Sequence, residues 1–144
     1  MSKLANPQVW KTAISRNESD GTVVIYRYVK EVIPSFLRSR QPDRILFVWR
    51  YNGERGMPSL NERNQMDDFE AALSPLQGDG FSTLAMVSTG NNLKEWTYYT
   101  QAEEAFIERL NLALQFRATF PVEIHVSFDP GWTTYERFVK AVKN

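Results

Sequence analysis

The chain has 144 residues, of which 42% are hydrophobic, and this is typical of one soluble globular domain rather than of a disordered or fibrous chain. Its 17 basic and 17 acidic residues cancel to a formal net charge of zero, which argues against a strongly charged nucleic-acid-binding or membrane-surface protein. The chain has no cysteine and one histidine, so disulfides, thiolate metal sites and cysteine nucleophiles are excluded. We expect a single domain over residues 1–144, with no metal site and no cofactor.

The chain also lacks the signals of secretion and membrane insertion. No apolar stretch follows the N-terminal residues, as it would in a secretory signal. The longest purely apolar run, Ile45–Trp49, is far shorter than the ~20 residues that a membrane-spanning helix needs. We therefore expect a cytoplasmic protein without a membrane partner.

The N-terminal segment predicts a β-hairpin. Val9–Arg16 and Thr22–Val29 have strand composition, and the Asp20-Gly21 pair between them is typical of a hairpin turn. An open sheet edge at this hairpin could support a homodimer.

The following segment predicts an irregular stretch and then an interior strand. Glu31–Asp43 is expected to be irregular because Pro34 and Pro42 interrupt it. Arg44–Tyr51 has apolar residues at both odd and even positions, which is typical of a central strand covered on both faces.

A loop and a helix are predicted next. Asn52–Met57 is a glycine-rich loop, and Ser59 with Glu62 forms a capping box that begins a helix. The apolar residues of this helix recur at spacings of three and four, and they are Met66, Phe69, Leu73 and Leu76. Gln77–Gly80 is expected to end it.

The C-terminal half predicts a second hairpin and a second helix. Strands are expected at Phe81–Thr89 and Leu93–Tyr99, around a turn at Gly90–Asn92. Thr100 and Glu103 form a second capping box. The inward face of the helix that follows is expected to be Phe106, Leu110, Ala113 and Leu114.

The chain ends in a predicted strand and a last helix. Val122–Phe128 alternates strictly, with apolar residues on one face and Glu123, His125 and Ser127 on the other. Asp129 is expected to cap a helix that starts at Pro130 and continues to about Val142.

The order of elements predicts an α+β fold with a mixed, mostly antiparallel sheet. The segment from Arg44 to Phe128 follows the β-α-β-β-α-β pattern of a ferredoxin-like, or split βαβ, core. The N-terminal hairpin is expected to extend the sheet. The C-terminal helix is expected to cover either an edge or the second face.

The geometry of a β-strand argues against the strongest catalytic pattern in the sequence. Glu123, His125 and Ser127 supply an acid, a base and a hydroxyl, but alternate strand residues lie about 6.6–6.8 Å apart with parallel side chains. A catalytic triad needs contacts of ~2.6–3.2 Å. We therefore interpret this face as a polar strand surface.

A ligand or partner surface is a further hypothesis. Arg55 stands in a loop before a helix N-terminus and Asp129 at a strand-to-helix junction, where binding residues are common. Aromatic side chains could be interface anchors where they are exposed, although the core is their ordinary place. The candidate residues are Arg50, Arg55, Trp96, Tyr98, His125, Asp129, Trp132 and Tyr135.

Several features together resemble a known family. They are Trp10, Gly56-Met-Pro58, the aromatic hairpin Trp96–Tyr99, the segment Pro121–His125 and the ending Asp129-Pro-Gly-Trp132-Thr-Thr-Tyr135. They resemble, over nearly the whole chain, the bacterial family known as domain of unknown function 695. The ending is the most specific part. This family has no assigned activity, so the resemblance implies no catalytic residues.

Three functional hypotheses follow. The first is a non-catalytic binding or regulatory domain that acts through a protein partner or a homodimer. The second is a small enzyme for an anionic or nucleotide-like substrate, with Arg50, Arg55, Glu95, Tyr98, His125 and Asp129 converging on one cleft. The third is an RNA-binding regulator that uses Arg27, Arg38, Arg40 and Arg44. The balanced net charge makes nucleic acid the weaker partner.

Overall fold

A computed structural model describes residues 10–30 and 35–142 of the chain. Its strands are β1 (Trp10–Arg16), β2 (Val23–Val29), β3 (Asp43–Arg50), β4 (Ser82–Gly90), β5 (Leu93–Thr100) and β6 (Val122–Phe128). Its α-helices are α1 (Ser35–Arg40), α2 (Leu60–Ala72), α3 (Glu103–Leu114) and α4 (Thr133–Val142). Two short 3-10 helices, η1 (Glu54–Gly56) and η2 (Ser74–Gly80), lie on either side of α2. The described part of the chain therefore has the predicted α+β class.

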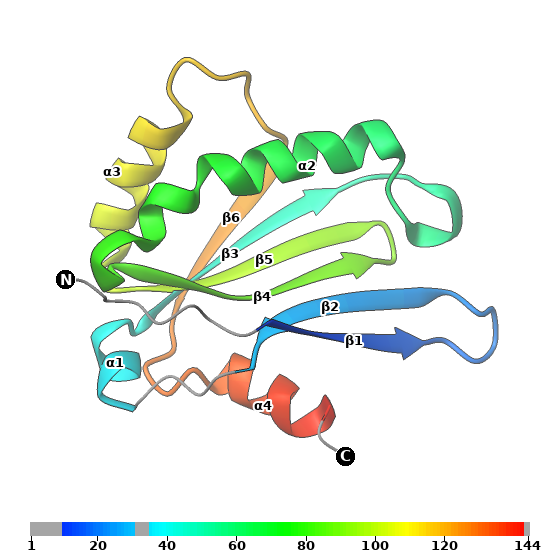
Figure 1. Ribbon diagram of the computed structural model, residues 1–144, viewed down its shortest axis with the longest axis horizontal. Helices are drawn as coiled ribbons and strands as arrows, with labels where there is room; N and C mark the ends of the chain where they lie inside the picture. The colour runs from blue at the N-terminus through cyan, green and yellow to red at the C-terminus, as the bar shows by residue number, and fades with distance from the viewer. Residues whose placement is uncertain (1–9, 31–34, 143–144) are drawn as a thin grey trace.

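The strands form one six-stranded sheet in the order β1-β2-β4-β5-β3-β6 (Figure 1). Every strand pair in it is antiparallel, so the prediction of a mixed sheet is wrong. The N-terminal hairpin pairs with β4 and extends the sheet, as expected. β3 lies between β5 and β6, which agrees with its prediction as an interior strand. The two edges of the sheet are β1 and β6.

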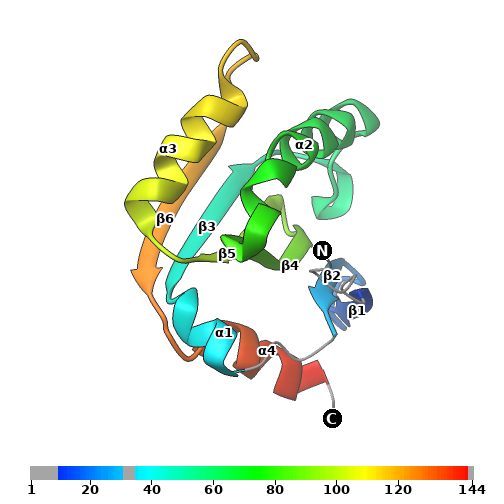
Figure 2. The same cartoon turned by 60° about the vertical axis from the view of Figure 1, so that its left-hand side comes forward.

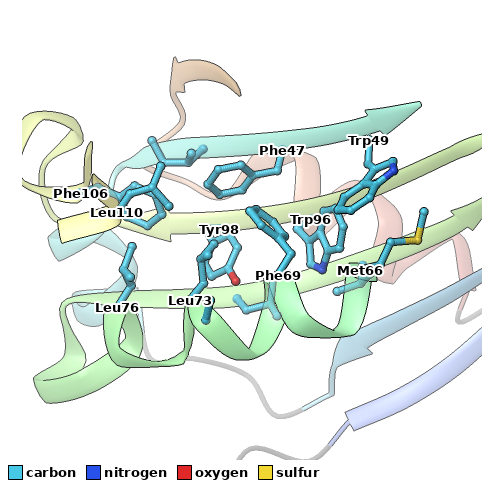
Figure 3. Close-up of a cluster of buried hydrophobic side chains, with 14 of the residues drawn as sticks. Phe47, Trp49, Met66, Phe69, Leu73, Leu76, Trp96, Tyr98, Phe106 and Leu110 are labelled. Atoms are coloured by element: carbon cyan, nitrogen blue, oxygen red, sulfur yellow. The ribbon is translucent and has the colours of Figure 1, made fainter. Parts of the chain in front are cut away.

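The larger core lies between the sheet and the helices α2 and α3 (Figures 2 and 3). Phe69 of α2 stands at its centre, with its ring 4.9 Å from that of Trp96 and 5.2 Å from that of Phe47. Phe106 of α3 packs on Phe47 and Tyr98 from the other side. We call this side of the sheet the α2/α3 face. Burial of large aromatic side chains is the main stabilising contribution here.

A smaller cluster lies on the opposite side of the sheet, which we call the α4 face. It consists of Ala85, Tyr99, Trp132 and Tyr135. The rings of Tyr99 and Trp132 stack with centroids 4.2 Å apart and an interplanar angle of 9°. Phe138 extends the contact to Tyr26 on β2. The C-terminal helix thus covers the second face, which is one of the two placements that the sequence left open.

The residues between β4 and β5 suit the backbone geometry of the turn that they form. Asn91 and Asn92 have φ angles of 54° and 63°, which is the left-handed pair that a two-residue hairpin turn requires. Gly90 approaches β2 so closely that an added Cβ would lie 2.8 Å from the Cα of Val24. A larger residue at position 90 would therefore separate β4 from β2.

One predicted irregular segment contains a helix. Within Glu31–Asp43, residues 35–40 form α1, so the prediction is wrong there, while residues 31–34 lie outside the described part. Val9, the predicted start of the first strand, also lies outside it. The two prolines flank α1 rather than interrupt it, which is why they misled the prediction.

Three helix boundaries also differ from the predictions, and one of them is the start of α4, which lies at Thr133 and not at Pro130. α2 is capped by Ser59, whose side chain accepts from the Glu62 amide, but it ends at Ala72, and Leu76 belongs to η2. The predicted capping box at Thr100 is wrong. Ala102 is the N-cap of α3, and the carboxylate of Asp43 accepts from the Glu103 amide at 2.9 Å instead. A contact from a distant strand replaces the local cap.

Candidate binding surface

The α4 face is covered at one end only. Beyond the α4 cluster, the same face opens into a groove of about 180 Å³ over β2, β4 and β5. We call it the open groove. Its lining residues are Val24, Tyr26, Met86, Ser88, Gly90, Asn91, Leu93, Glu95 and Thr97. The strand register places them on one face because directly paired residues of an antiparallel sheet point the same way.

The open groove combines an apolar lining with a single carboxylate. Tyr26, Met86 and Leu93 are half-buried and supply apolar surface. The Glu95 carboxylate accepts a long bond of 3.4 Å from the Ser88 hydroxyl. Glu95 is the one acidic residue among the lining residues, so the groove favours a ligand that is apolar and carries a positive charge.

A charged cluster lies on the same face, one strand beyond β3. Arg50 Nε donates to Glu123 Oε2 at 2.7 Å, and His125 Nε2 lies 3.3 Å from Glu123 Oε1. The Arg50 bond, followed by the His125 bond, holds the pKa of Glu123 below its usual value, and Glu123 in turn raises the pKa of Arg50. We call these residues the charged cluster. All are exposed, so they can meet a partner.

Ser127 has a different role from a nucleophile. Its hydroxyl accepts from Arg44 Nε at 3.1 Å. Residues Glu123, His125 and Ser127 share a strand face, as the alternation predicts, and the interpretation as a polar surface agrees with this geometry. Among the described residues, no group of three or more His, Asp or Glu side chains could hold a metal ion.

Asp129 positions the start of α4. Its carboxylate accepts from the amides of Thr133 at 2.8 Å and Thr134 at 3.2 Å, and from the Tyr99 hydroxyl at 2.9 Å. Burial raises the pKa of Asp129, but the bonds from these donors outweigh it and keep the pKa below its usual value. Burial, together with the Asp129 bond, raises the pKa of Tyr99. The helix begins at Thr133 and not at the predicted Pro130, so Asp129 precedes it by a turn; its carboxylate nevertheless accepts from the first two helical amides, and it ties α4 to β5.

Trp132 and Tyr135 dock α4 against the sheet. Trp132 is 1% exposed and donates its indole N–H to the Gln41 carbonyl at 3.0 Å. It does so in a left-handed conformation with φ of 55°, which is strained for a bulky residue. The Tyr135 hydroxyl donates to the Val29 carbonyl. The specific ending of the chain therefore builds a docking contact, not an accessible site.

Trp96 and Tyr98 lie on the α2/α3 face and are fully buried. The Trp96 indole donates to Glu70 at 3.0 Å, and Glu70 also pairs with Arg27 at 2.6 Å. The Tyr98 hydroxyl has no hydrogen-bond partner within the described residues, and burial raises its pKa. These two predicted site residues are core residues.

A second, wider groove of about 520 Å³ lies between α2 and β2. It is lined by Arg27, Asp67, Glu70, Ala71, Ser74 and Gln77. Arg27 and Glu70, the charged residues of this groove that are least exposed, form an ion pair with each other. This groove is therefore less suited to an ionic ligand than its residue types suggest.

Arg55 lies at the end of the sheet where the two hairpin turns meet. Its guanidinium donates to the Asp20 carbonyl at 3.0 Å, and its backbone is left-handed with φ of 55°. Gly56 accepts from the Asn92 amide at 3.0 Å. This loop joins the β1–β2 and β4–β5 turns, so Arg55 has a structural role that the sequence did not predict.

The eight predicted residues do not form one site. Arg50 and His125 meet through Glu123 on the open part of the α4 face. The other members are either buried on the opposite face, bound into the α4 docking contact, or held at the turns, and they are Trp96, Tyr98, Asp129, Trp132, Tyr135 and Arg55. The convergence that the enzyme hypothesis requires is not present in this arrangement.

Sequence reasoning missed the apolar part of the open groove. The sequence pattern places Tyr26 and Met86 in strands and indicates no functional role for them. The signal that could have found them is the register of the sheet, which sets Tyr28 opposite Met86 and Tyr26 opposite Ser88. That register depends on pairing between distant segments, and no local pattern encodes it.

Comparison with known protein families identifies the family to which the chain belongs. The model of the family of unknown function DUF695 matches residues 8–139, so the chain belongs to this family, as its resemblance indicated. Neither the curated proteins nor the solved structures gave a match. Within the described residues, no helix is long and apolar enough to cross a membrane.

Proposed function

We propose that this member of the DUF695 family is a non-catalytic binding domain of the bacterial cytoplasm that acts through a protein partner seated on the open groove. The observation that carries this proposal is the incomplete cover of the α4 face. An apolar, half-buried sheet surface lies open beside an exposed charged cluster. Apolar centres with polar rims are the usual composition of protein–protein interfaces.

The size of the open groove favours a protein over a small substrate. Its volume is about 180 Å³, whereas pockets that enclose small-molecule ligands usually measure roughly 300–1,000 Å³. A groove of this size accommodates a side chain from a partner rather than a whole substrate. A shallow seat for one anchoring side chain is typical of an interface hot spot.

The chemistry of the groove specifies the partner further. An apolar side chain would pack against Tyr26, Met86 and Leu93. A lysine or arginine close to it would meet the Glu95 carboxylate, which accepts only a long bond from the Ser88 hydroxyl. The proposed partner segment is therefore apolar and basic, and a regulatory role would follow from its occupancy of the groove.

We also infer that the central strands form a ferredoxin-like core. The supporting observations are the order β4-β5-β3-β6 and the position of both crossover helices, α2 and α3, on one face. If these four strands are numbered one to four along the chain, their order across the sheet is 2-3-1-4, which is the strand order of a split βαβ unit. This fold class hosts many functions and does not by itself support any one of them.

The alternatives receive less support. Of the six residues of the enzyme hypothesis, Arg50, Glu95 and His125 share the α4 face, but Tyr98 is buried on the opposite face, Arg55 is held at the turns and Asp129 belongs to the α4 docking contact. Of the arginines in the RNA-binding hypothesis, three have contacts within the protein: Arg27 with Glu70, Arg38 with Glu136 and Arg44 with Ser127. Arg38 also lies over the rings of Trp132 and Tyr135.

Native mass spectrometry of protein purified gently in low salt from its own host tests this proposal. Wild type is expected to retain a protein mass that Glu95→Lys loses, because the substitution reverses the charge in the groove. Glu108→Lys is the matched control, since it makes the same charge change on the exposed side of α3. Co-purification that is insensitive to Glu95→Lys contradicts the proposal.

Other retained masses would favour the other hypotheses. A bound small molecule would support the enzyme, and an RNA whose binding weakens steeply with salt would support the RNA-binding regulator. Both outcomes would overturn the protein-binding proposal. Circular dichroism of both lysine variants confirms that the fold is unchanged.

A further inference from the structure

The two edge strands of the sheet differ in the side chains that protect an edge against pairing with another strand. β1 carries Lys11 and Arg16, and charged side chains on an edge discourage pairing with another strand. β6 has no lysine, arginine or proline. It also exposes apolar side chains, with relative exposures of 41% for Ile124, 39% for Val126 and 74% for Phe128. β6 does carry one acidic residue, Glu123, which is paired with Arg50 on the α4 face, but its α2/α3 face is uncharged and apolar and is a template for pairing.

The exposure of β6 follows from the position of α3. Phe106 fixes this helix over Phe47 of β3 and Tyr98 of β5, which are interior strands. β6 flanks β3 at the far end of the sheet from β1 (Figure 2). Because α3 is centred over the interior strands, it leaves the apolar side chains of β6 partly uncovered.

The hydrogen-bond pattern shows which backbone groups of β6 are free. The amide of Asp129 donates to the Pro42 carbonyl at 2.7 Å, so this pair is a hydrogen-bonded one. Hydrogen-bonded pairs alternate along an antiparallel ladder. The N–H and C=O groups of residues 123, 125 and 127 therefore face β3, and those of Ile124, Val126 and Phe128 face away from the sheet.

We propose that β6 is the pairing strand of a homodimer, in which a second copy of this chain adds its own β6 in antiparallel orientation about a two-fold axis at His125. In this register Ile124 lies opposite Val126 of the other copy, and Val122 lies opposite Phe128. The outward-facing amides of Ile124 and Val126 then meet outward-facing carbonyls. The two sheets become one continuous sheet.

The sequence of β6 is complementary to itself in this register. Every apolar side chain on the α2/α3 face meets another apolar side chain, which stabilises cross-strand pairs. On the other face Glu123 lies opposite Ser127, so its carboxylate does not meet its own copy. Only His125 faces itself.

Other registers fit less well. A shift of one residue opposes outward-facing groups with groups already bonded to β3, and it sets apolar residues against polar ones. A shift of two residues preserves the hydrogen-bond pattern but leaves part of each strand unpaired. The register centred on His125 brings the largest part of β6 into contact with its copy, and only the Val122 amide, which donates to the Phe120 carbonyl at 2.9 Å, is already bonded.

This dimer uses the opposite edge from the N-terminal hairpin that the sequence suggested, and it does not depend on the proposed groove partner. It would place two charged clusters side by side, since Glu123 and His125 lie on β6 itself. The open parts of the two α4 faces would then form one extended surface. The two proposals share Glu123 and His125 of the charged cluster, but they can be tested separately because the groove is probed at Glu95 on β5 and the dimer at the edge strands.

Single-cysteine variants give a register-specific test, because the chain has no cysteine of its own. In the proposed dimer, position 125 faces its own copy across a non-hydrogen-bonded pair, with Cα atoms about 4.5 Å apart, which permits a disulfide. Position 123 is about 13 Å from its own copy. His125→Cys is expected to form a disulfide-linked dimer at least ~10-fold faster than Glu123→Cys under mild oxidation.

Ile14→Cys is the control for the other edge, since Ile14 is 60% exposed on β1. Preferential linking of this variant would overturn the proposal in favour of the N-terminal hairpin. Equal rates for all the variants would indicate random collision, and a monomer at all accessible concentrations would also overturn it. The three side chains are exposed, so the substitutions leave the core intact.

A second pair of variants measures assembly without oxidation. Val126→Lys is expected to weaken the dimer at least ~10-fold by sedimentation, because it sets a charge against Ile124 of the other copy. Ile14→Lys places the same charge on the other edge and is expected to leave the dimer unchanged. Equal effects of the two variants contradict pairing through β6.

Discussion

The two faces of the sheet are covered by helices to different extents. The α2/α3 face buries a large aromatic cluster under two helices. The α4 face has four fully buried residues in its core, and beyond them it opens into a groove. One layer of the fold thus provides most of the stability, whereas the other provides a short docking contact and a surface.

This difference shows where the fold can accommodate a function. Residues of the α2/α3 face pack among many neighbours, so a change there is transmitted through the core. The polar side chains at the surface of the α4 face, such as Glu95 in the open groove and His125 in the charged cluster, can change with little effect on folding. Figure 3 shows how closely the aromatic rings of the larger core interdigitate. Variants on the two faces can test this division of roles.

The largest effect is expected for Phe69→Ala. Phe69 is fully buried and packs against the rings of Phe47, Trp49 and Trp96. Its removal loses apolar burial and leaves a cavity, so the free energy of unfolding is expected to fall by about 3–5 kcal/mol. Urea denaturation followed by far-ultraviolet circular dichroism measures this change.

Leu60→Ala is the matched control on the same helix. Leu60 is 66% exposed, so its truncation should change the free energy of unfolding by less than ~0.5 kcal/mol. A similar loss for both variants would show that the α2/α3 face is not the main source of stability.

A smaller and more local effect is expected for Trp132→Ala. The stacking on Tyr99 and the bond to Gln41 join α4 to the sheet. Their loss is expected to reduce stability by about 1–3 kcal/mol and to undock α4 while the larger core stays folded. Hydrogen exchange should then increase in α4 and not in β3 or β5.

Arg137→Ala tests whether this effect is specific, since Arg137 is exposed on the same helix. It should leave hydrogen exchange in α4 unchanged. If Trp132→Ala instead increases exchange equally in β3 and α4, the two faces fold as one unit, and the contrast between them is incorrect.

The predictions from sequence succeeded where the pattern is local. Alternation in Val122–Phe128 identified both faces of β6, and the turn at Gly90–Asn92 has the expected hairpin form. Ser59 caps α2 through the Glu62 amide. Each of these features is determined by residues a few positions apart, so periodicity and turn chemistry were sufficient.

The features that depend on distant contacts could not be predicted. The cap of α3 comes from Asp43, sixty residues away in the chain. Trp132 bonds to Gln41 across a separation of 91 residues. The contact between Trp132 and Gln41 helps to determine which end of the α4 face is covered. The position of the open groove, and the exposure of Tyr26 and Met86 in it, therefore appeared only with the assembled fold.

The smallest effect is expected at the junction of β6 and α4, and it depends on pH. Asp129→Asn retains a capping side chain but removes the negative charge beside the helix N-terminus, so wild type should be more stable by about 0.5–1 kcal/mol near pH 7. Since the folded-state pKa of Asp129 is lowered, this contribution is present above the ordinary value of 3.8 and is lost as the pH falls through the folded-state value. Urea denaturation of both proteins between pH 7 and pH 3 should therefore show a difference that shrinks in acid. Asp68→Asn, on the exposed surface of α2, controls for the general effect of losing a carboxylate. A difference for Asp129→Asn that is independent of pH would mean that the negative charge contributes nothing, and that Asp129 acts only through the geometry of its hydrogen bonds.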